Sequence, residues 1–186
     1  MRNTFKTLLG FVASVLEKYT PLQISGGKLE DTYNYLRIDD RIATSGQPTE
    51  SQFRLIRDAG YTTVINLAPQ SILENSLKTE AGLLNELGMQ YIHIPVDFKQ
   101  PTEHDFKEFV AVMQATAKQK VWVHCAANMR VSAFIYRYRC TVLSEDQQSA
   151  HIALLQIWEP VGVWRRFTSV RRSRTRSQER GRRGSP

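Results

Sequence analysis

The segment VWVHCAANMRVSAF, residues 121–134, decides the fold that this sequence predicts. It begins with VWVHC, a short apolar run typical of a buried β-strand. The next four residues, AANM, are small or flexible, and a helix is predicted beyond them from about Arg130 to Cys140. A strand, a tight loop and a helix in direct succession form the unit from which parallel sheets are built.

Similar strand and helix patterns alternate before this segment. YTTVINL at 61–67 and MQYIHIPV at 89–96 are β-branched and apolar and predict buried strands, and YNYLRIDDRIATSG at 33–46 adds short strand material. Helices are predicted around 79–87 and from Pro101 onward. We therefore expect one three-layer α/β domain with a central, mostly parallel four- to five-stranded sheet flanked by helices.

Capping patterns mark where two of the helices begin. Thr49 is followed three residues later by Gln52, and Ser144 is followed by Gln147, before a helix that continues toward Trp158. A hydroxyl residue with Gln at this spacing is typical of a capping box.

Charge and composition divide the chain into three parts. Nine of the 25 basic residues but only one of the 18 acidic residues lie from Arg165 onward, so the rest of the chain is nearly neutral. We expect an amphipathic helix at 1–20, the α/β domain at 21–160, and a helix remnant with a basic, disordered tail at 161–186. The tail would bind acidic partners or nucleic acid, or would be an extension without selected function, even one from a shifted reading frame.

The first 20 residues resemble a signal peptide only in part. Arg2 and Lys6 precede an apolar run, but Glu17 and Lys18 interrupt it and no small-residue cleavage site follows. The apolar residues recur at helical spacing, at Phe5, Leu8, Leu9, Val12, Val15, Leu16 and Tyr19. We expect a helix packed on the body, with export and attachment to a membrane surface as alternatives, and no membrane span.

Cys125 ends its strand and is the candidate reactive residue. In α/β sheets, ligands bind outside the carboxyl ends of the strands. A loop before a helix N-terminus directs backbone N–H groups and the positive dipole end at one point, which favours an anion and the thiolate form of a cysteine. A thiolate there could attack phosphorus or sulfur. The alternative is a cysteine that only packs in the core, which we expect for Cys140.

Other classes of site have little support in the sequence. The two cysteines do not form a secreted disulfide framework, so a reducing, cytoplasmic location is expected. His93, His104 and His151 are scattered and predict no metal site. No glycine-rich nucleotide loop is present, and no cofactor is expected.

The order His-Cys, short loop, Arg, Ser resembles the signature of the protein-tyrosine and dual-specificity phosphatase superfamily. RIATSGQPTESQFRLIRDAGYTTVINL, at 41–67, is similar to the opening of that domain, especially in a bacterial branch of beta-lactamase-hydrolase-like phosphatases. The resemblance covers roughly residues 33–158. It implies hydrolysis of a phosphorylated protein or small phosphoester through a phosphocysteine, without a cofactor.

The resemblance also implies roles for individual residues. Cys125 would be the nucleophile, and His124 would tune it through hydrogen bonds of the loop. Asp97 would protonate the leaving group, unless it only caps a loop, and Asp105 is the weaker candidate because it lies where a helix cap is expected. Ser132 would help the thiolate to leave. Phosphate would be bound by Ala126, Ala127, Asn128, Met129 and Arg130.

The spacing of the arginine departs from the family pattern. The family places five residues between cysteine and arginine, whereas four intervene here, so Val131 holds the expected position and Arg130 comes one residue early. Because a bidentate guanidinium depends on direction, this shift leaves three interpretations. They are a working phosphatase with a re-aimed Arg130, a pseudophosphatase that binds phosphorylated ligands, and a rhodanese-type sulfurtransferase, whose loop has the shorter spacing.

Overall fold

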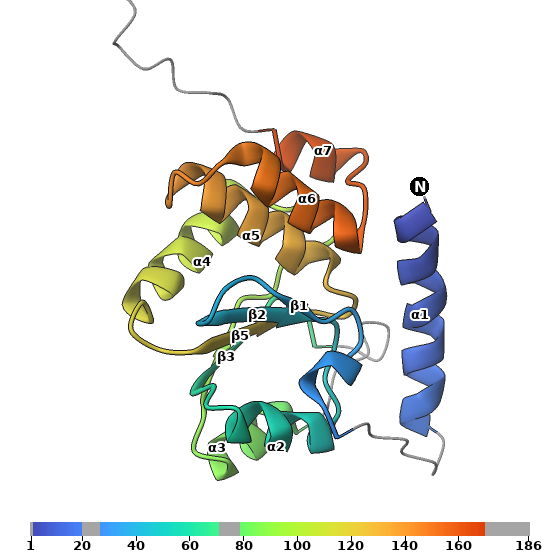
Figure 1. Ribbon diagram of the computed structural model, residues 1–186, viewed down its shortest axis with the longest axis vertical. Helices are drawn as coiled ribbons and strands as arrows, with labels where there is room; N and C mark the ends of the chain where they lie inside the picture. The colour runs from blue at the N-terminus through green and yellow to red at the C-terminus, as the bar shows by residue number, and fades with distance from the viewer. Residues whose placement is uncertain (1, 20–26, 71–78, 170–186) are drawn as a thin grey trace, which may run out of the picture.

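A five-stranded sheet lies at the centre of the molecule (Figure 1). The computed structural model describes residues 2–19, 27–70 and 79–169. The strand order is β1-β2-β5-β3-β4, with β1 antiparallel to β2 and the other pairs parallel. The strands are β1 (Leu36–Arg37), β2 (Ile42–Ser45), β3 (Thr63–Asn66), β4 (Gln90–His93) and β5 (Val121–His124).

Helices cover both faces of this sheet (Figure 1). One face carries α4 (Glu103–Ala115), α5 (Met129–Thr141), α6 (Gln147–Ile157) and α7 (Val163–Phe167). The other face carries α2 (Glu50–Asp58) and α3 (Glu80–Glu86). The predicted three-layer α/β fold with a mostly parallel sheet is therefore confirmed.

The side chains of β5 alternate between two cores. Val121 and Val123 are fully buried against the α4–α7 layer, and Trp122 is fully buried against α2 and α3. The indole Nε1 of Trp122 donates to the Ser45 hydroxyl at 2.9 Å, so the one polar atom of this large side chain is satisfied. A strand buried on both faces lacks the alternation of apolar and polar residues, as VWVHC does, and its one polar residue, His124, is buried as well.

Capping residues were predicted for two helices, and one of the two predictions is wrong. Thr49 and Gln52 form the capping box of α2 as predicted. Ser144 does not cap α6: it lies in a left-handed turn with φ 55°, and Asp146 accepts the N–H of Ser149 at 2.8 Å instead. Asp146 directly precedes the helix, and a carboxylate at that position satisfies the open N–H groups and complements the helix dipole.

The N-terminal helix α1 (Arg2–Tyr19) is present, but its first turns contact the body through polar side chains. Asn3 and Thr7 donate to backbone carbonyls at the C-terminal end of α6, at 2.8 and 2.6 Å. Leu8, Leu9 and Val12 are 52%, 56% and 56% exposed. The expected helix is therefore present and contacts the body, with donors of its first turns bonded to the open carbonyls at the end of α6.

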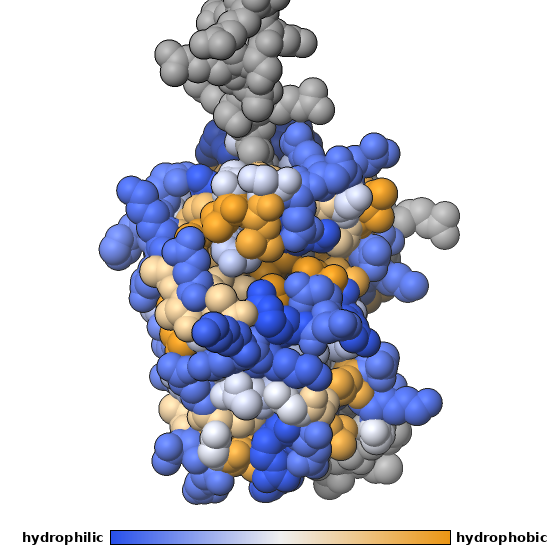
Figure 2. Space-filling model, turned by 60° about the vertical axis from the view of Figure 1, so that its left-hand side comes forward, coloured by the Kyte–Doolittle hydropathy of each residue, from blue (hydrophilic) through white to orange (hydrophobic). Residues whose placement is uncertain are grey.

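Most of the predicted basic tail lies outside the described residues, which end at residue 169. Within the described part, none of the helices has the length and hydropathy that a membrane-spanning segment needs. Figure 2 shows one face of the molecule, on which hydrophobic side chains form separate patches between hydrophilic ones.

Candidate active site

The segment that carries Cys125 joins β5 to α5, and we call residues 125–130, the last two of which begin α5, the 125–130 loop. β5 is the central strand of the sheet, with β2 on one side and β3 on the other. The Cys125 side chain directly follows this strand and is 1% exposed. The reactive residue therefore lies at the carboxyl edge of the parallel strands, where α/β proteins bind ligands.

The carbonyl groups of the 125–130 loop are bonded to the segment that flanks it. The Gln47 backbone N–H donates to the Ala126 carbonyl at 3.3 Å, and the Asn34 side-chain amide donates to the Ala127 carbonyl at 3.0 Å. Within residues 27–70 and 79–169, the N–H groups of Ala126 and Ala127 have no hydrogen-bond partner. A loop with occupied carbonyls and open N–H groups is suited to bind an anion.

Asn128 makes the sharp turn of the loop possible. Its φ of 62° lies in the left-handed region, which asparagine tolerates better than most residues. The side chain is fully buried and its amide donates to the Asn34 carbonyl at 2.7 Å and to the Thr44 hydroxyl at 2.9 Å. Asn128 therefore takes the place that glycine often has in such loops and ties the loop to β2.

The N-terminus of α5 is open toward the loop. Asn128 is the N-cap residue, but no side chain of the described residues caps the first turn, and the side-chain oxygen of Asn128 has no hydrogen-bond partner among them. The first N–H groups of an uncapped helix and the positive end of its dipole attract anions. The helix end and the loop together provide one anion-binding environment next to Cys125.

Arg130 lies in the first turn of α5 and is almost completely buried, at 3% exposure. Its guanidinium carbon lies 5.3 Å from the centre of the Phe98 ring, which is a cation–π contact. Phe98 directly follows Asp97 in the chain. The structure thus brings Arg130 next to the segment that carries the predicted general acid.

Asp97 follows β4, which is not next to the strand that ends at Cys125. In the sheet, β3 lies between β4 and β5. The segment before it remains bonded to the end of β3, with the Val96 N–H donating to the Leu67 carbonyl at 3.1 Å. The exposed Asp97 carboxylate accepts the Lys99 N–H at 2.8 Å, so it also caps its own loop.

The remaining predicted residues have local partners. The Ser132 hydroxyl donates to the Met129 carbonyl at 3.1 Å, within its own helix. Asp105 caps α4 reciprocally with Thr102, as expected for the weaker of the two acid candidates. Cys140 is half-buried, and burial is the main cause that raises the pKa of its thiol, which fits a packing role.

One residue of this region was not predicted from the sequence. Glu80, at the start of α3, is 2% exposed. One carboxylate oxygen, Oε1, accepts from His124 Nε2 at 3.0 Å and from the Asn66 amide at 3.1 Å. The other oxygen, Oε2, accepts from the Gln47 amide at 2.7 Å. An acidic residue in the first turn of a helix is common on protein surfaces, so the sequence carries no local signal for this contact.

The Glu80 carboxylate is stabilised in its charged form. Burial by itself raises the pKa of this group, but the charge of His124 and hydrogen bonds from His124, Gln47 and Tyr91 outweigh it, so the net pKa lies below its ordinary value. A buried carboxylate needs donors on both oxygens, and Glu80 has them.

Tyr33 connects the site to α1. Burial raises the pKa of its hydroxyl, and the charge of the nearby Cys125 adds to this effect. The protonated hydroxyl donates to the Thr7 carbonyl of α1. The helix therefore lies against the part of the body that faces the 125–130 loop, and Figure 1 shows it standing across the layers at this end of the sheet.

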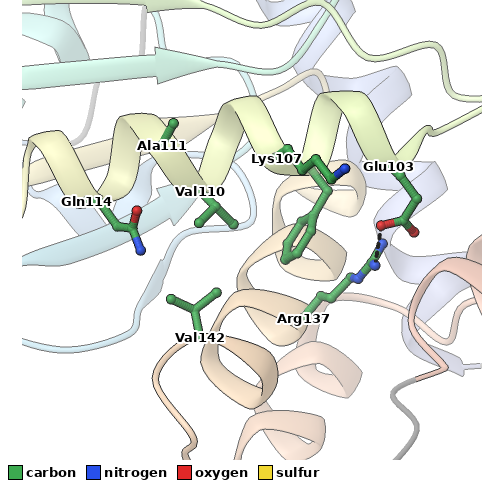
Figure 3. Close-up of a pocket in the computed structure, with 8 residues that line it drawn as sticks. Glu103, Lys107, Val110, Ala111, Gln114, Arg137 and Val142 are labelled. Atoms are coloured by element: carbon green, nitrogen blue, oxygen red, sulfur yellow. Dashed lines mark hydrogen bonds and ion pairs between the residues drawn. The ribbon is translucent and has the colours of Figure 1, made fainter.

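A surface pocket of about 340 Å³ lies elsewhere, between α4 and α5 (Figure 3). Figure 3 shows Arg137 of α5 reaching Glu103 of α4 at one end of it, with 2.6 Å between guanidinium nitrogen and carboxylate oxygen. None of the residues that line it belongs to the 125–130 loop. Among the described residues, no group of three or more His, Cys, Asp or Glu side chains is placed to hold a metal ion.

Comparison with known protein families gives a match over most of the chain. The family model described as "DSP-PTPase phosphatase fused to NAD+ Kinase" matches residues 28–159. A beta-lactamase hydrolase-like protein of Xylella fastidiosa (strain Temecula1) is 33% identical over 95 residues. This match spans 50% of the present chain but only 22% of the length of that relative.

Solved structures show the same architecture. A protein named as a DUF442 phosphatase, from Shewanella putrefaciens CN-32, is 30% identical, with a TM-score of 0.67 and 75% of this chain and 89% of that chain covered. The core catalytic domain of the PP-IP phosphatase SIW14 from S. cerevisiae has a TM-score of 0.62 at 14% identity, with 74% and 84% covered. At that identity the second likeness concerns the fold alone.

Proposed function

The chain belongs to the family of DSP-PTPase phosphatases fused to NAD+ kinase, and we propose that it hydrolyses phosphate monoesters with Cys125 as the nucleophile. The observation that carries this proposal is the 125–130 loop. Its carbonyls at Ala126 and Ala127 accept hydrogen bonds from Gln47 and Asn34, outside the loop. The helix that follows has an uncapped N-terminus. Cys125 would thus meet the phosphorus of an ester whose oxygens are held by backbone N–H groups.

The first chemical step would transfer the phosphoryl group to sulfur. The Cys125 thiolate donates an electron pair to phosphorus, and the bond from phosphorus to the leaving oxygen breaks. That oxygen would take a proton from Asp97, whose loop is joined to Arg130 through the Phe98 ring. The guanidinium of Arg130 would bind two of the remaining phosphate oxygens.

The second step would restore the enzyme. Water attacks phosphorus and loses a proton to Asp97, and the sulfur–phosphorus bond breaks with its electron pair returning to Cys125. The Ser132 hydroxyl would turn from the Met129 carbonyl to donate to the departing thiolate. Inorganic phosphate leaves, and no cofactor takes part. The substrates would be phosphotyrosine, phosphoserine or small phosphoesters.

Hydrolysis of a fluorogenic aryl phosphate tests the proposal. We expect turnover by the unaltered protein and none by Cys125→Ser, whose hydroxyl is a far weaker nucleophile. If the unaltered protein has no turnover, but phosphate or vanadate protects Cys125 from alkylation, the chain is the phosphate-binding pseudophosphatase. Thiocyanate formed from thiosulfate and cyanide would identify the sulfurtransferase.

A further inference from the structure

A buried carboxylate and a buried imidazole lie directly behind the reactive cysteine. The side chains of His124 and Glu80 are 0% and 1% exposed and 3.0 Å apart. His124 is the residue before Cys125, at the end of β5. Burying two ionisable groups costs free energy, which their mutual contact only partly offsets. Such an arrangement is common where a site needs a defined geometry or charge.

The Glu80 contact requires a proton on Nε2 of His124. The carboxylate is held in its charged form by three donors from different parts of the fold, so it can only accept at Oε1 and His124 Nε2 must donate. Among the described residues, Nδ1 of His124 has no hydrogen-bond partner. Within the described residues, the bond to Glu80 is thus the only hydrogen bond that orients the imidazole ring of His124.

Glu80 is also connected to the other side of the 125–130 loop. The Gln47 side-chain amide donates to Glu80, and the Gln47 backbone N–H donates to the Ala126 carbonyl. One carboxylate is therefore hydrogen-bonded to His124, the residue before Cys125, and is connected through Gln47 to Ala126, the residue after it.

We propose that Glu80 is a positioning residue for Cys125, which it holds in its attacking geometry by orienting His124 and, through Gln47, the start of the loop. This inference rests on the proposed function in so far as Cys125 is a nucleophile, and it adds a residue outside the signature. Glu80 does not touch the substrate. It acts through its neighbours, as outer-shell carboxylates do for the histidine ligands of metal sites.

The test measures the alkylation rate of Cys125 by iodoacetamide in a Cys140→Ser background, which leaves one thiol. Glu80→Gln keeps the shape but removes the charge and one of the two acceptor oxygens, so the side chain can no longer accept from both His124 and Gln47. We expect alkylation about tenfold slower, within the range of couplings between contacting residues. Where turnover is present, kcat falls and KM changes little, because ground-state phosphate binding uses the loop N–H groups.

Two comparisons separate positioning from a general loss of stability. Tyr91→Phe removes a hydroxyl from the same network without touching His124, and its alkylation rate should stay within about twofold of the parent. In a His124→Asn background, Glu80→Gln should have a clearly smaller effect, because only its contact with Gln47 is left. Glu80→Asp retains the charge if Glu80→Gln does not fold, and should give an intermediate rate.

The opposite results would overturn the proposal. They are an unchanged alkylation rate in folded Glu80→Gln, an equal loss in Tyr91→Phe, or effects of Glu80→Gln and His124→Asn that simply multiply. Alkylation does not depend on turnover, so failure of the proposed hydrolysis and failure of the Glu80 role are observed separately.

Discussion

At the scale of single residues, the early arginine is the main point on which the proposed phosphatase activity depends. Arg130 is buried and lies on the Phe98 ring, which limits the directions in which its guanidinium can point. A planar fork can bind two phosphate oxygens only from a suitable direction. The shorter spacing is therefore compatible with binding only if the helix start directs Arg130 toward the loop.

Arg130→Lys tests that direction. We expect phosphate to protect Cys125 from alkylation at least about tenfold less well, because an ammonium cannot replace the bidentate fork. Arg139→Lys is the matched control: it lies on the same helix, pairs with Glu145 at 2.7 Å and should leave protection unchanged. Equal protection of Cys125 by phosphate in Arg130→Lys and in the parent would show that Arg130 does not bind phosphate.

The dependence of turnover on the leaving group of the ester distinguishes a general acid at Asp97 from a residue that only caps its loop. Asp97→Asn should lower turnover of an alkyl phosphate by about 10²-fold or more, within the range for general acid catalysis, and that of an activated aryl phosphate much less. Alkylation of Cys125 should not change. Asp105→Ala should cost about 1 kcal/mol of stability through its cap and leave both turnovers intact. Equal losses for both esters in Asp97→Asn would contradict a role as acid.

Glu80 predicts a pH dependence of stability. Its pKa in the folded state lies below the ordinary value of 4.5, so its contribution is complete above that pH and is lost as the pH falls through the lower folded value. The unaltered protein should exceed Glu80→Gln in free energy of unfolding at neutral pH, and the difference should shrink below pH 4.5. Urea unfolding at several pH values measures this. A difference that is constant or grows toward acid pH would contradict a charged Glu80.

At the scale of elements, the backbone of α1 at Gly10 lies close to the Tyr33 ring of the body. A Cβ added at Gly10 would lie 2.6 Å from a carbon of the Tyr33 ring, well inside contact distance. Gly10→Leu should therefore loosen α1, and hydrogen exchange of the amides of α1 should become faster. Leu9→Ala changes an exposed side chain and is expected to leave exchange near the parent rate. Unchanged exchange in Gly10→Leu would mean that α1 does not depend on this contact.

Elements whose signals are local were predictable from the sequence. The strand that ends at Cys125, the loop and the start of α5 follow from apolar runs, small residues and short spacing, and the Thr49 cap follows from a motif of four residues. Features set by distant contacts were not. Glu80 meets a histidine 44 positions away, and α1 docks through Asn3 and Thr7 on carbonyls about 150 positions away. The prediction that Ser144 caps α6 was wrong because Asp146, a better acceptor, lies closer to the helix.

At the scale of the whole molecule, the sheet order explains how distant residues meet at one site. β5 lies between β2 and β3, so the loop after it is flanked by the ends of two strands that come much earlier in the chain. Gln47 follows one of these strands and Asn66 ends the other, and both donate to Glu80. Cys125 is therefore supported by residues of β3, β5 and α3 and of the segment that follows β2.

The most direct measurement is mass spectrometry of the protein after rapid acid quenching during turnover of an aryl phosphate. We expect one added phosphoryl group on the peptide that contains Cys125, more of it in Asp97→Asn if water attack is slowed, and none in Cys125→Ser. A phosphoryl group on another residue, or turnover that persists in Cys125→Ser, would contradict a phosphocysteine mechanism for this chain.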